Sequence, residues 1–228
     1  MKTVRISLPF VFCLLAFGVS SYLSLADGFH QGHDWLFEMV RSAQFKAALE
    51  MGQRIPYWAP DLFHGHGSPI FLFYAPLFAA LTAWLQGLTG VWLEAFGLAL
   101  TLLTALGGLG IYLLASELTG EPAHKGMAGR VSLYLYLLAP YLLADKWLRN
   151  ANAEFAGLAL VPFLLLGVLL LRRRSGIGFL VTAISMAAVI LAHNLTALWA
   201  FACAISLVCA IALQGRSVLF ALRGMGAL

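Results

Sequence analysis

The chain has 228 residues, of which 61% are hydrophobic and only 11% are charged, and its mean hydropathy is +0.88. Soluble domains carry about 25% charged residues. The composition therefore excludes an ordinary soluble domain and predicts an all-α, polytopic membrane helix bundle. The net charge of +4 does not indicate nucleic-acid binding, because most basic residues lie in short clusters between apolar runs, where topology signals occur.

Six apolar runs are candidate transmembrane helices. The first is long enough to span, at about 20 residues, so we favour an uncleaved helix over a signal peptide. Two of the later runs are shorter than about 17 residues and need flanking residues to cross. The runs are Ser7–Ala26, Ala95–Ser116, Val131–Ala144, Phe155–Leu171, Ile177–Ala192 and Leu195–Leu213.

A seventh apolar stretch, Ser68–Gly87, decides the topology. If it crossed the membrane, the later basic residues would lie outside, against the positive-inside rule. If it stays at the interface or re-enters, those residues become cytoplasmic. We therefore expect six crossings of the cell (plasma) membrane, with a cytoplasmic N-terminus and an extracytoplasmic active face. The deciding residues are Lys125, Arg130, Arg172, Arg173, Arg174, Arg216 and Arg223.

Three polar segments then emerge on the outer face. They are a long first extracytoplasmic loop (27–94), a second loop with the sequence DKWLRNANAE (145–154), and the pair His193-Asn194 at a helix junction. Of the ten acidic residues, only Glu117 and Glu121 lie inside in this arrangement. The distribution predicts a single membrane domain with a site that faces out of the cell.

Within the first loop, Trp35–Met51 has the spacing of an amphipathic interfacial helix. Apolar residues stand at positions 36, 37, 40, 45, 48 and 49, while Glu38, Arg41 and Lys46 lie off that face. Asp34 stands immediately before it. One interpretation makes Asp34 the N-cap, which accepts backbone N–H bonds, and the other makes it a functional carboxylate.

The segments around these loops resemble a known class of membrane enzyme. RIPYWAPDLFHGHGSPIFLFYAPL (Arg54–Leu77), preceded by the aspartate and the amphipathic helix, resembles the first outer loop of GT-C glycosyltransferases. LAPYLLADKWLRNANAEFAGLALVPFLLL (Leu138–Leu166) resembles their second outer loop, and LAHNLTAL (Leu191–Leu198) also fits. Within the class, the chain is most similar to prokaryotic membrane proteins described as "6-pyruvoyl-tetrahydropterin synthase-related". GT-C proteins are usually longer, so the resemblance implies either an N-terminal portion, which would be inactive alone, or a minimal form.

The resemblance implies transfer of a sugar from a polyprenyl-phosphate donor to an acceptor on the extracytoplasmic face. Such a transfer needs a base and a positive charge that stabilises the leaving phosphate. The candidate catalytic carboxylates are Asp34 and Glu154. The candidate substrate-binding residues are Lys146, Arg149, His193, Asn194 and Tyr74.

Each candidate also has a structural interpretation. Glu154 is placed to interact with the dipole of the helix that follows it. Lys146 and Arg149 are placed as interfacial side chains that extend their charges into water. His193 and Asn194 are placed as a polar helix terminus. A divalent metal, Mg²⁺ or Mn²⁺, is a further expectation at Asp34 and His33, and Zn²⁺ is another at the histidines His30, His33, His64 and His66.

The aromatic segment Ile70–Trp84 has two interpretations. We expect it to form a groove wall for a lipid tail, and the alternative is simple anchoring at the membrane interface. At the level of function, the alternatives to a glycosyltransferase are a transporter or flippase of a lipid-linked substrate, and a non-catalytic membrane subunit. The expected partners are membrane lipid and the polyprenyl-phosphate sugar donor, with no nucleic acid.

Overall fold

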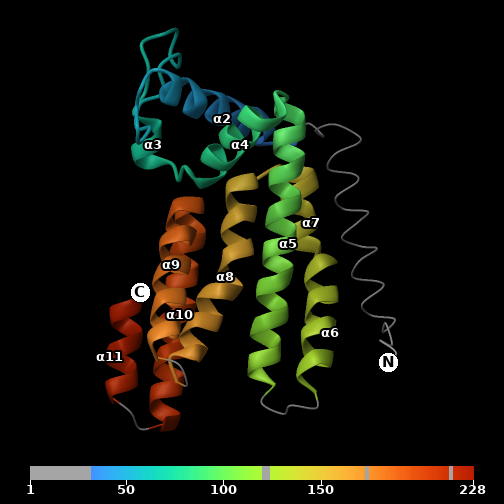
Figure 1. Ribbon diagram of the computed structural model, residues 1–228, viewed down its shortest axis with the longest axis vertical. Coiled ribbons are helices and arrows are strands. Elements are labelled where there is room, and N and C mark those ends of the chain that lie inside the picture. The colour runs from blue at the N-terminus through green and yellow to red at the C-terminus, as the bar shows by residue number, and fades with distance from the viewer. Residues whose placement is uncertain (1–31, 120–123, 173–174, 216–217) are drawn as a thin grey trace.

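The computed structural model describes residues 32–119, 124–172, 175–215 and 218–228, which are mostly helical (Figure 1). Among these residues there is no β-strand, only an isolated bridge between Ala59 and Ser68. The expected all-α class is therefore confirmed. The elements are α2 (Trp35–Glu50), α3 (Ile70–Phe73), α4 (Leu77–Thr89), α5 (Trp92–Leu118), α6 (Lys125–Leu137), α7 (Pro140–Ala144), the π-helix η1 (Asp145–Arg149), α8 (Asn152–Leu170), α9 (Ser175–Ala192), α10 (Asn194–Gly215) and α11 (Val218–Ala227).

Four helical stretches in the described part of the chain are long and apolar enough to cross a membrane, which indicates a membrane protein. The expected run Ile177–Ala192 lies in α9 and counts among the shorter apolar helices. The first expected run, Ser7–Ala26, lies outside the described residues. The structure thus shows a helical bundle with four candidate spans, and the count of six crossings stays a prediction. The four stretches are Trp92–Leu118, Gly126–Arg149, Asn152–Leu170 and Asn194–Gln214.

Helices α5 to α10 run alongside one another, and α8 lies between α5 on one side and α9 and α10 on the other (Figure 1). Their close approach depends on small residues. A Cβ atom at Gly167 of α8 would lie 2.6 Å from the backbone nitrogen of Thr182 in α9. Lipid offers no hydrophobic drive between helices, so van der Waals contact of this kind is what holds transmembrane helices together.

Residues 32–90, which we call the head module, sit at the end of the bundle where α5, α8 and α10 begin (Figure 1). Its α4 has 13 residues and is about 20 Å long, which is too short to cross a hydrocarbon core of about 30 Å. The stretch Ser68–Gly87 therefore forms α3 and α4 instead of a span, as the basic residues led us to expect. Phe78 of α4 packs edge-to-face on Phe96 of α5, with 5.4 Å between ring centroids, and joins the module to the bundle.

The helix α2 forms over the range that its periodicity predicts, but it buries part of its polar side. Glu38 and Arg41 are 2% and 8% exposed, whereas Leu36 and Phe37 are 58% and 68% exposed. Phe45 is one of the few residues of the apolar stripe that the module buries. The helix thus presents apolar side chains outwards, which suits a helix at a membrane interface.

The expected second outer loop, residues 145–154, is almost entirely helical. Its first half is η1, which continues α7, and α8 begins at Asn152. Only Asn150 and Ala151 connect the two helices, and Asn150 adopts a left-handed conformation with φ of 54°. The expectation of a loop over these residues is therefore wrong as to conformation, whereas their extracytoplasmic position stays a prediction.

Candidate functional site

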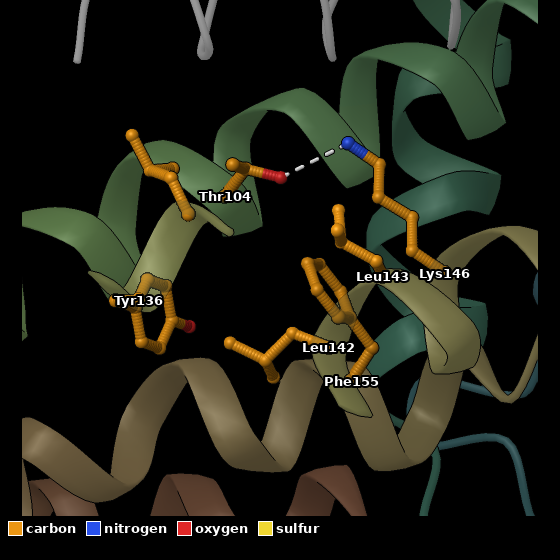
Figure 2. A pocket seen from close by; sticks show the side chains of 7 residues that line it. Thr104, Tyr136, Leu142, Leu143, Lys146 and Phe155 are labelled. Atoms are coloured by element: carbon orange, nitrogen blue, oxygen red, sulfur yellow. Dashed lines mark hydrogen bonds between the residues drawn. The ribbon is translucent and has the colours of Figure 1, made fainter. Parts of the chain in front are cut away.

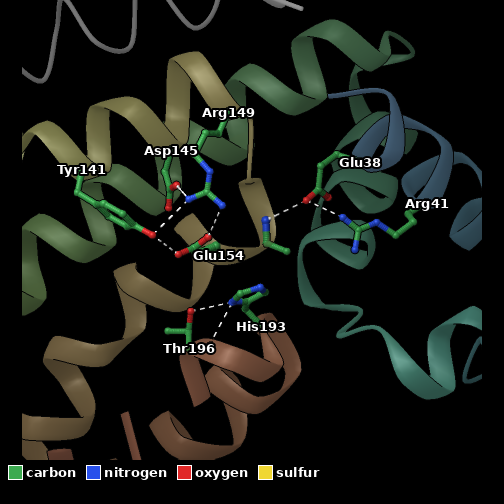
Figure 3. Close-up of polar contacts among 9 residues, drawn as sticks. Glu38, Arg41, Tyr141, Asp145, Arg149, Glu154, His193 and Thr196 are labelled. Atoms are coloured by element: carbon green, nitrogen blue, oxygen red, sulfur yellow. Dashed lines mark hydrogen bonds and ion pairs between the residues drawn. The ribbon is translucent and has the colours of Figure 1, made fainter. Parts of the chain in front are cut away.

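Polar side chains from α7, η1 and α8 converge where the bundle meets the head module (Figure 3). Arg149 contacts Asp145 through Nη1, and its Nη2 lies 3.0 Å from Glu154 Oε2. The Tyr141 hydroxyl donates to Glu154 Oε1 and accepts from Arg149 Nη1 at 3.2 Å. Asp145 is fully buried, whereas the Arg149 side chain is 38% exposed. We call these four residues the Arg149 cluster.

Local backbone geometry places the cluster. Asp145 and Arg149 stand four positions apart at the two ends of the π-helix η1, a spacing at which helical side chains contact one another. Asn150 then ends the helix, and its side-chain amide donates to the Lys146 carbonyl at 3.0 Å. Glu154 stands in the first turn of α8, where a carboxylate interacts favourably with the helix dipole. The sequence-based interpretation of Glu154 as a helix-start acid and its place in the cluster are thus compatible.

Asp34 lies next to this cluster at the N-cap position of α2. Its backbone N–H donates to the Arg149 carbonyl at 2.8 Å. The side chain is half-buried and makes no capping hydrogen bond, so the expected bond to backbone N–H groups is absent. The contact brings Asp34 and Glu154 to the same end of the bundle, each beside Arg149, as the sequence prediction required.

The ion pair of Glu38 and Arg41 was not among the residues that the sequence singled out. Arg41 Nη2 lies 2.7 Å from Glu38 Oε1, and Glu38 also accepts a hydrogen bond from the Ala153 N–H at 3.2 Å. Burial raises the pKa of Glu38 to about 7, although Arg41 and the Ala153 N–H act in the opposite direction, and the nearby Asp34 charge adds to the rise. The spacing of three positions on one helix was the available signal, and it is too common to be specific.

His193 and Asn194 occupy the start of α10, facing the head module. His193 Nδ1 lies 2.8 Å from the Thr196 hydroxyl and accepts from the Thr196 N–H at 3.3 Å. This is the polar helix terminus that the sequence suggested. Burial lowers the pKa of His193, Glu154 opposes that shift, and Arg41 and Arg149 add to it, so His193 lies within electrostatic reach of both arginines.

Asn194 joins the bundle to the head module. Its side-chain amide donates to the backbone carbonyl of Phe73 at 2.8 Å. Tyr74, the next residue, is 51% exposed, and the Arg41 guanidinium lies 4.3 Å from its ring centroid. The aromatic segment Ile70–Trp84 has both buried and exposed rings. Phe71 and Phe78 are buried and thus do not line a groove for a lipid tail, whereas Phe73, Tyr74 and Trp84 are exposed.

Lys146 points towards Thr104 of α5 (Figure 2). It is 2% exposed, and its ammonium lies 3.2 Å from the Thr104 hydroxyl of α5. It lines a cavity of about 20 Å³, which has room for about one water molecule, with apolar and aromatic neighbours. The interpretation of Lys146 as an interfacial side chain that extends its charge into water is therefore wrong, and its contact with a lipid phosphate stays a prediction. The other lining residues are Thr104, Tyr136, Leu137, Leu142, Leu143 and Phe155.

The expected metal site has few ligands among the residues that the structure describes. These residues contain no group of three or more His, Cys, Asp or Glu side chains arranged to hold a metal ion. His33, His64 and His66 are all exposed, and His30 lies outside the described residues. Asp34 and His33 alone do not make a dedicated site for Mg²⁺ or Mn²⁺.

No known protein family, curated protein or solved structure matches this chain. The site is therefore described by its own geometry. It combines three carboxylates (Asp34, Asp145 and Glu154), a partly exposed guanidinium, a tyrosine and a histidine whose pKa burial lowers, at the ends of apolar helices. Such a site can orient a hydroxyl group and accept a proton.

Proposed function

We propose that the protein transfers a sugar from a polyprenyl-phosphate donor to an acceptor at the head-module end of the bundle, in the manner of GT-C glycosyltransferases. The observation that carries the proposal is the position of Asp34, whose backbone N–H bonds to the Arg149 carbonyl, at the end of the bundle where the Arg149 guanidinium pairs with Glu154. A polyprenyl-phosphate donor has an apolar part and a charged part, and this site offers apolar helices beside a guanidinium. Its lipid tail requires apolar surface, and its phosphate requires a fixed positive charge.

The reaction assigns one role to each group. The acceptor hydroxyl oxygen attacks the anomeric carbon, and the bond from that carbon to the phosphate oxygen breaks, so its electron pair leaves with the polyprenyl phosphate. Asp34 takes the acceptor proton. Arg149 faces the negative charge that develops on the phosphate. A guanidinium has five N–H donors, more than its contacts with Asp145, Glu154 and Tyr141 use.

Glu154 and Tyr141 orient Arg149 in this scheme. Tyr141 contacts Nη1 of Arg149, Glu154 contacts Nη2, and the two side chains also bond to each other. The guanidinium therefore meets the donor in one orientation instead of many. Preorganised charge of this kind usually contributes more than any other single effect to stabilising a transition state. His193 and Tyr74 stand at the border of the site, where they are placed to contact the sugar.

The experiment uses the full chain in lipid vesicles with a radiolabelled polyprenyl-phosphate monosaccharide, and measures loss of label from the lipid fraction. Asp34→Asn should lower the rate at least about 100-fold, the range for general-base loss. Asp61→Asn is the control, because Asp61 is an exposed carboxylate of the same module that bonds to Gln44. Near-normal turnover by Asp34→Asn would remove Asp34 from the site, and no release by the unmodified chain would sink the proposed activity.

A plasma-membrane location with the head module outside belongs to the same proposal. Cysteine substitutions at His64 and Gly176 test it, because both positions are exposed and lie at opposite ends of the bundle. A membrane-impermeant thiol reagent applied to intact cells should label His64→Cys and leave Gly176→Cys unlabelled. The reverse result would place the head module in the cytoplasm.

Transport of a lipid-linked substrate is the second candidate, and one observation favours it. Asp145 and Lys146 are buried within the apolar stretch Gly126–Arg149. Ionisable residues inside a span often mark a transport path. Lys146→Met separates the two functions, since it should abolish transport of a fluorescent polyprenyl phosphate between leaflets but reduce sugar release only indirectly.

A further inference from the structure

Glu38 forms a contact that joins the head module to the first turn of α8 (Figure 3). Its side chain is buried, and Oε1 accepts a hydrogen bond from the Ala153 N–H at 3.2 Å. The two residues are 115 positions apart in the chain. A contact over that separation is tertiary, and it disappears if α2 and α8 move relative to one another.

The Ala153 N–H is one of the amides at the start of α8 that have no acceptor within the helix. An N-cap side chain usually supplies the acceptor. The N-cap of α8 is Ala151, which makes no such bond. Glu38 supplies the acceptor from a different helix. The next residue, Glu154, belongs to the Arg149 cluster, so the turn that Glu38 holds is the turn that presents this carboxylate.

Arg41 fixes Glu38 in this position. The two form an ion pair that is almost fully buried, and Arg41 also lies over the ring of Tyr74. A buried charge that loses its partner is strongly destabilising. If Glu38 moved away from Ala153, the buried Arg41 guanidinium would lose its carboxylate partner, and this cost in free energy keeps Glu38 in place. The head module therefore holds α8 through a side chain whose own position is set from within the module.

Other hydrogen bonds tie the head module to the bundle at different points. Asn150 Oδ1 accepts from the Gly32 N–H at 2.7 Å, and Asp34 bonds to the Arg149 carbonyl. Asn194 bonds to the Phe73 carbonyl from α10. These contacts hold η1 and α10, whereas the Glu38 contact acts on α8 itself.

We propose that Glu38 is a positioning residue, which sets the first turn of α8 and thereby places the Glu154 carboxylate against Arg149. The effect on turnover rests on the proposed sugar transfer, whereas the hold on α8 does not. A ligand that shifts the head module through Tyr74 or Arg41 would move Glu154 by the same contact.

Hydrogen exchange directly measures how well the Glu38 contact protects the Ala153 N–H at the start of α8. The full chain is placed in lipid nanodiscs, and exchange is followed by mass spectrometry in peptides that cover residues 150–157. Glu38→Ala should speed exchange at Ala153 at least about fivefold, the factor expected for loss of one hydrogen bond. Glu38→Gln keeps an acceptor oxygen for Ala153 and should exchange more slowly than Glu38→Ala, although it no longer carries the charge that pairs with Arg41. The matched control is Glu50→Ala, an exposed carboxylate of the same helix that pairs with Lys46.

Turnover measures the consequence. Glu38→Ala should lower kcat for release of sugar from the polyprenyl-phosphate probe about tenfold or more while changing KM little, because the group acts on placement within the bound complex. Glu38→Gln should restore most of the rate. A purely structural role would instead lower the amount of active protein without this rescue.

The outcomes are distinguishable. Unchanged exchange at Ala153 in Glu38→Ala overturns the inference. If Glu38→Ala fails to fold, which faster exchange throughout α9 would reveal, Glu38→Asp replaces it, because its shorter side chain keeps the charge and loses the reach to Ala153. Unchanged exchange in Glu38→Asp then overturns it as well. If exchange responds but the unmodified chain releases no sugar, the proposed function fails and the hold on α8 stands.

Discussion

The head module and the bundle both expose apolar side chains, and α2 of the head module also buries a charged pair. In the bundle, apolar side chains such as Ile184 and Trp199 are both 67% exposed, as expected for surfaces that face lipid. In the head module, α2 buries Glu38 and Arg41 and exposes Leu36. Apolar periodicity therefore marks where a helix forms in both regions, but in a membrane protein it does not say which face packs against the rest of the chain.

The largest expected effect is at the junction of the two regions. Phe78→Ala removes a ring that is 1% exposed and packs on Phe96, so it should lower the free energy of unfolding by about 3–5 kcal/mol. Thermal unfolding in detergent measures this change. Phe73→Ala, at an exposed ring of the same module, should stay within about 0.5 kcal/mol. Equal effects would mean that the two regions are not joined through this contact.

A second substitution compares packing within each region. Gly167→Ala forces a methyl group against the Thr182 backbone and should destabilise the bundle by about 1–3 kcal/mol. Gly87 in α4 has open space around it, so Gly87→Ala should stabilise the head module by about 0.5–1 kcal/mol through helix propensity. Chemical unfolding of both variants measures the two changes in free energy of unfolding. If both changes had the same sign, the expected contrast between the two regions would be wrong.

The buried carboxylate of the head module should make stability depend on pH. Burial raises the pKa of Glu38 from 4.5 to about 7, so folding favours its neutral form. Its contribution to stability is complete below about pH 4.5 and is lost as pH rises through about 7. Glu38→Gln should therefore reduce the fall in Tm between about pH 5 and about pH 8 by several degrees. If Tm fell as much in Glu38→Gln as in the unmodified chain, the pH dependence would come from other groups.

The smallest expected effect concerns the exposed edge of the head module. Tyr74→Ala removes the ring under Arg41 and should cost about 0.5–1 kcal/mol. Tyr74→Phe retains an aromatic face and should cost less. Differential scanning calorimetry of both variants in the same detergent ranks them, and a larger loss in the Phe variant would show that the hydroxyl matters more than the ring.

Much of the fold followed from simple patterns. Long apolar runs predicted α5, α8 and α10, because a span must be both apolar and long. The distribution of Lys and Arg predicted that Ser68–Gly87 would not cross, and α3 and α4 are indeed too short to do so. The sequence did not predict the π-helix of residues 145–149, since a wider turn leaves no periodic signal within five residues.

The site was predicted in part. Asp34, Arg149 and Glu154 come together at one end of the bundle, which the topology argument required. Lys146 did not join them, because one position along a helix turns a side chain by about 100°, and here that turn directs it towards Thr104. Glu38 was not predicted because its partner amide, Ala153, belongs to a helix more than a hundred positions away, and no local spacing reports such a contact.

The π-helix between α7 and α8 has a consequence at the level of the gene. An α-helix holds 3.6 residues in each turn, so deletion of one codon among residues 145–149 would allow the segment to close as an ordinary α-helix. The deletion would remove or shift one member of the contact between Asp145 and Arg149, while every apolar helix kept its composition. Descendants of this sequence should therefore exchange residues in this segment more readily than they change its length.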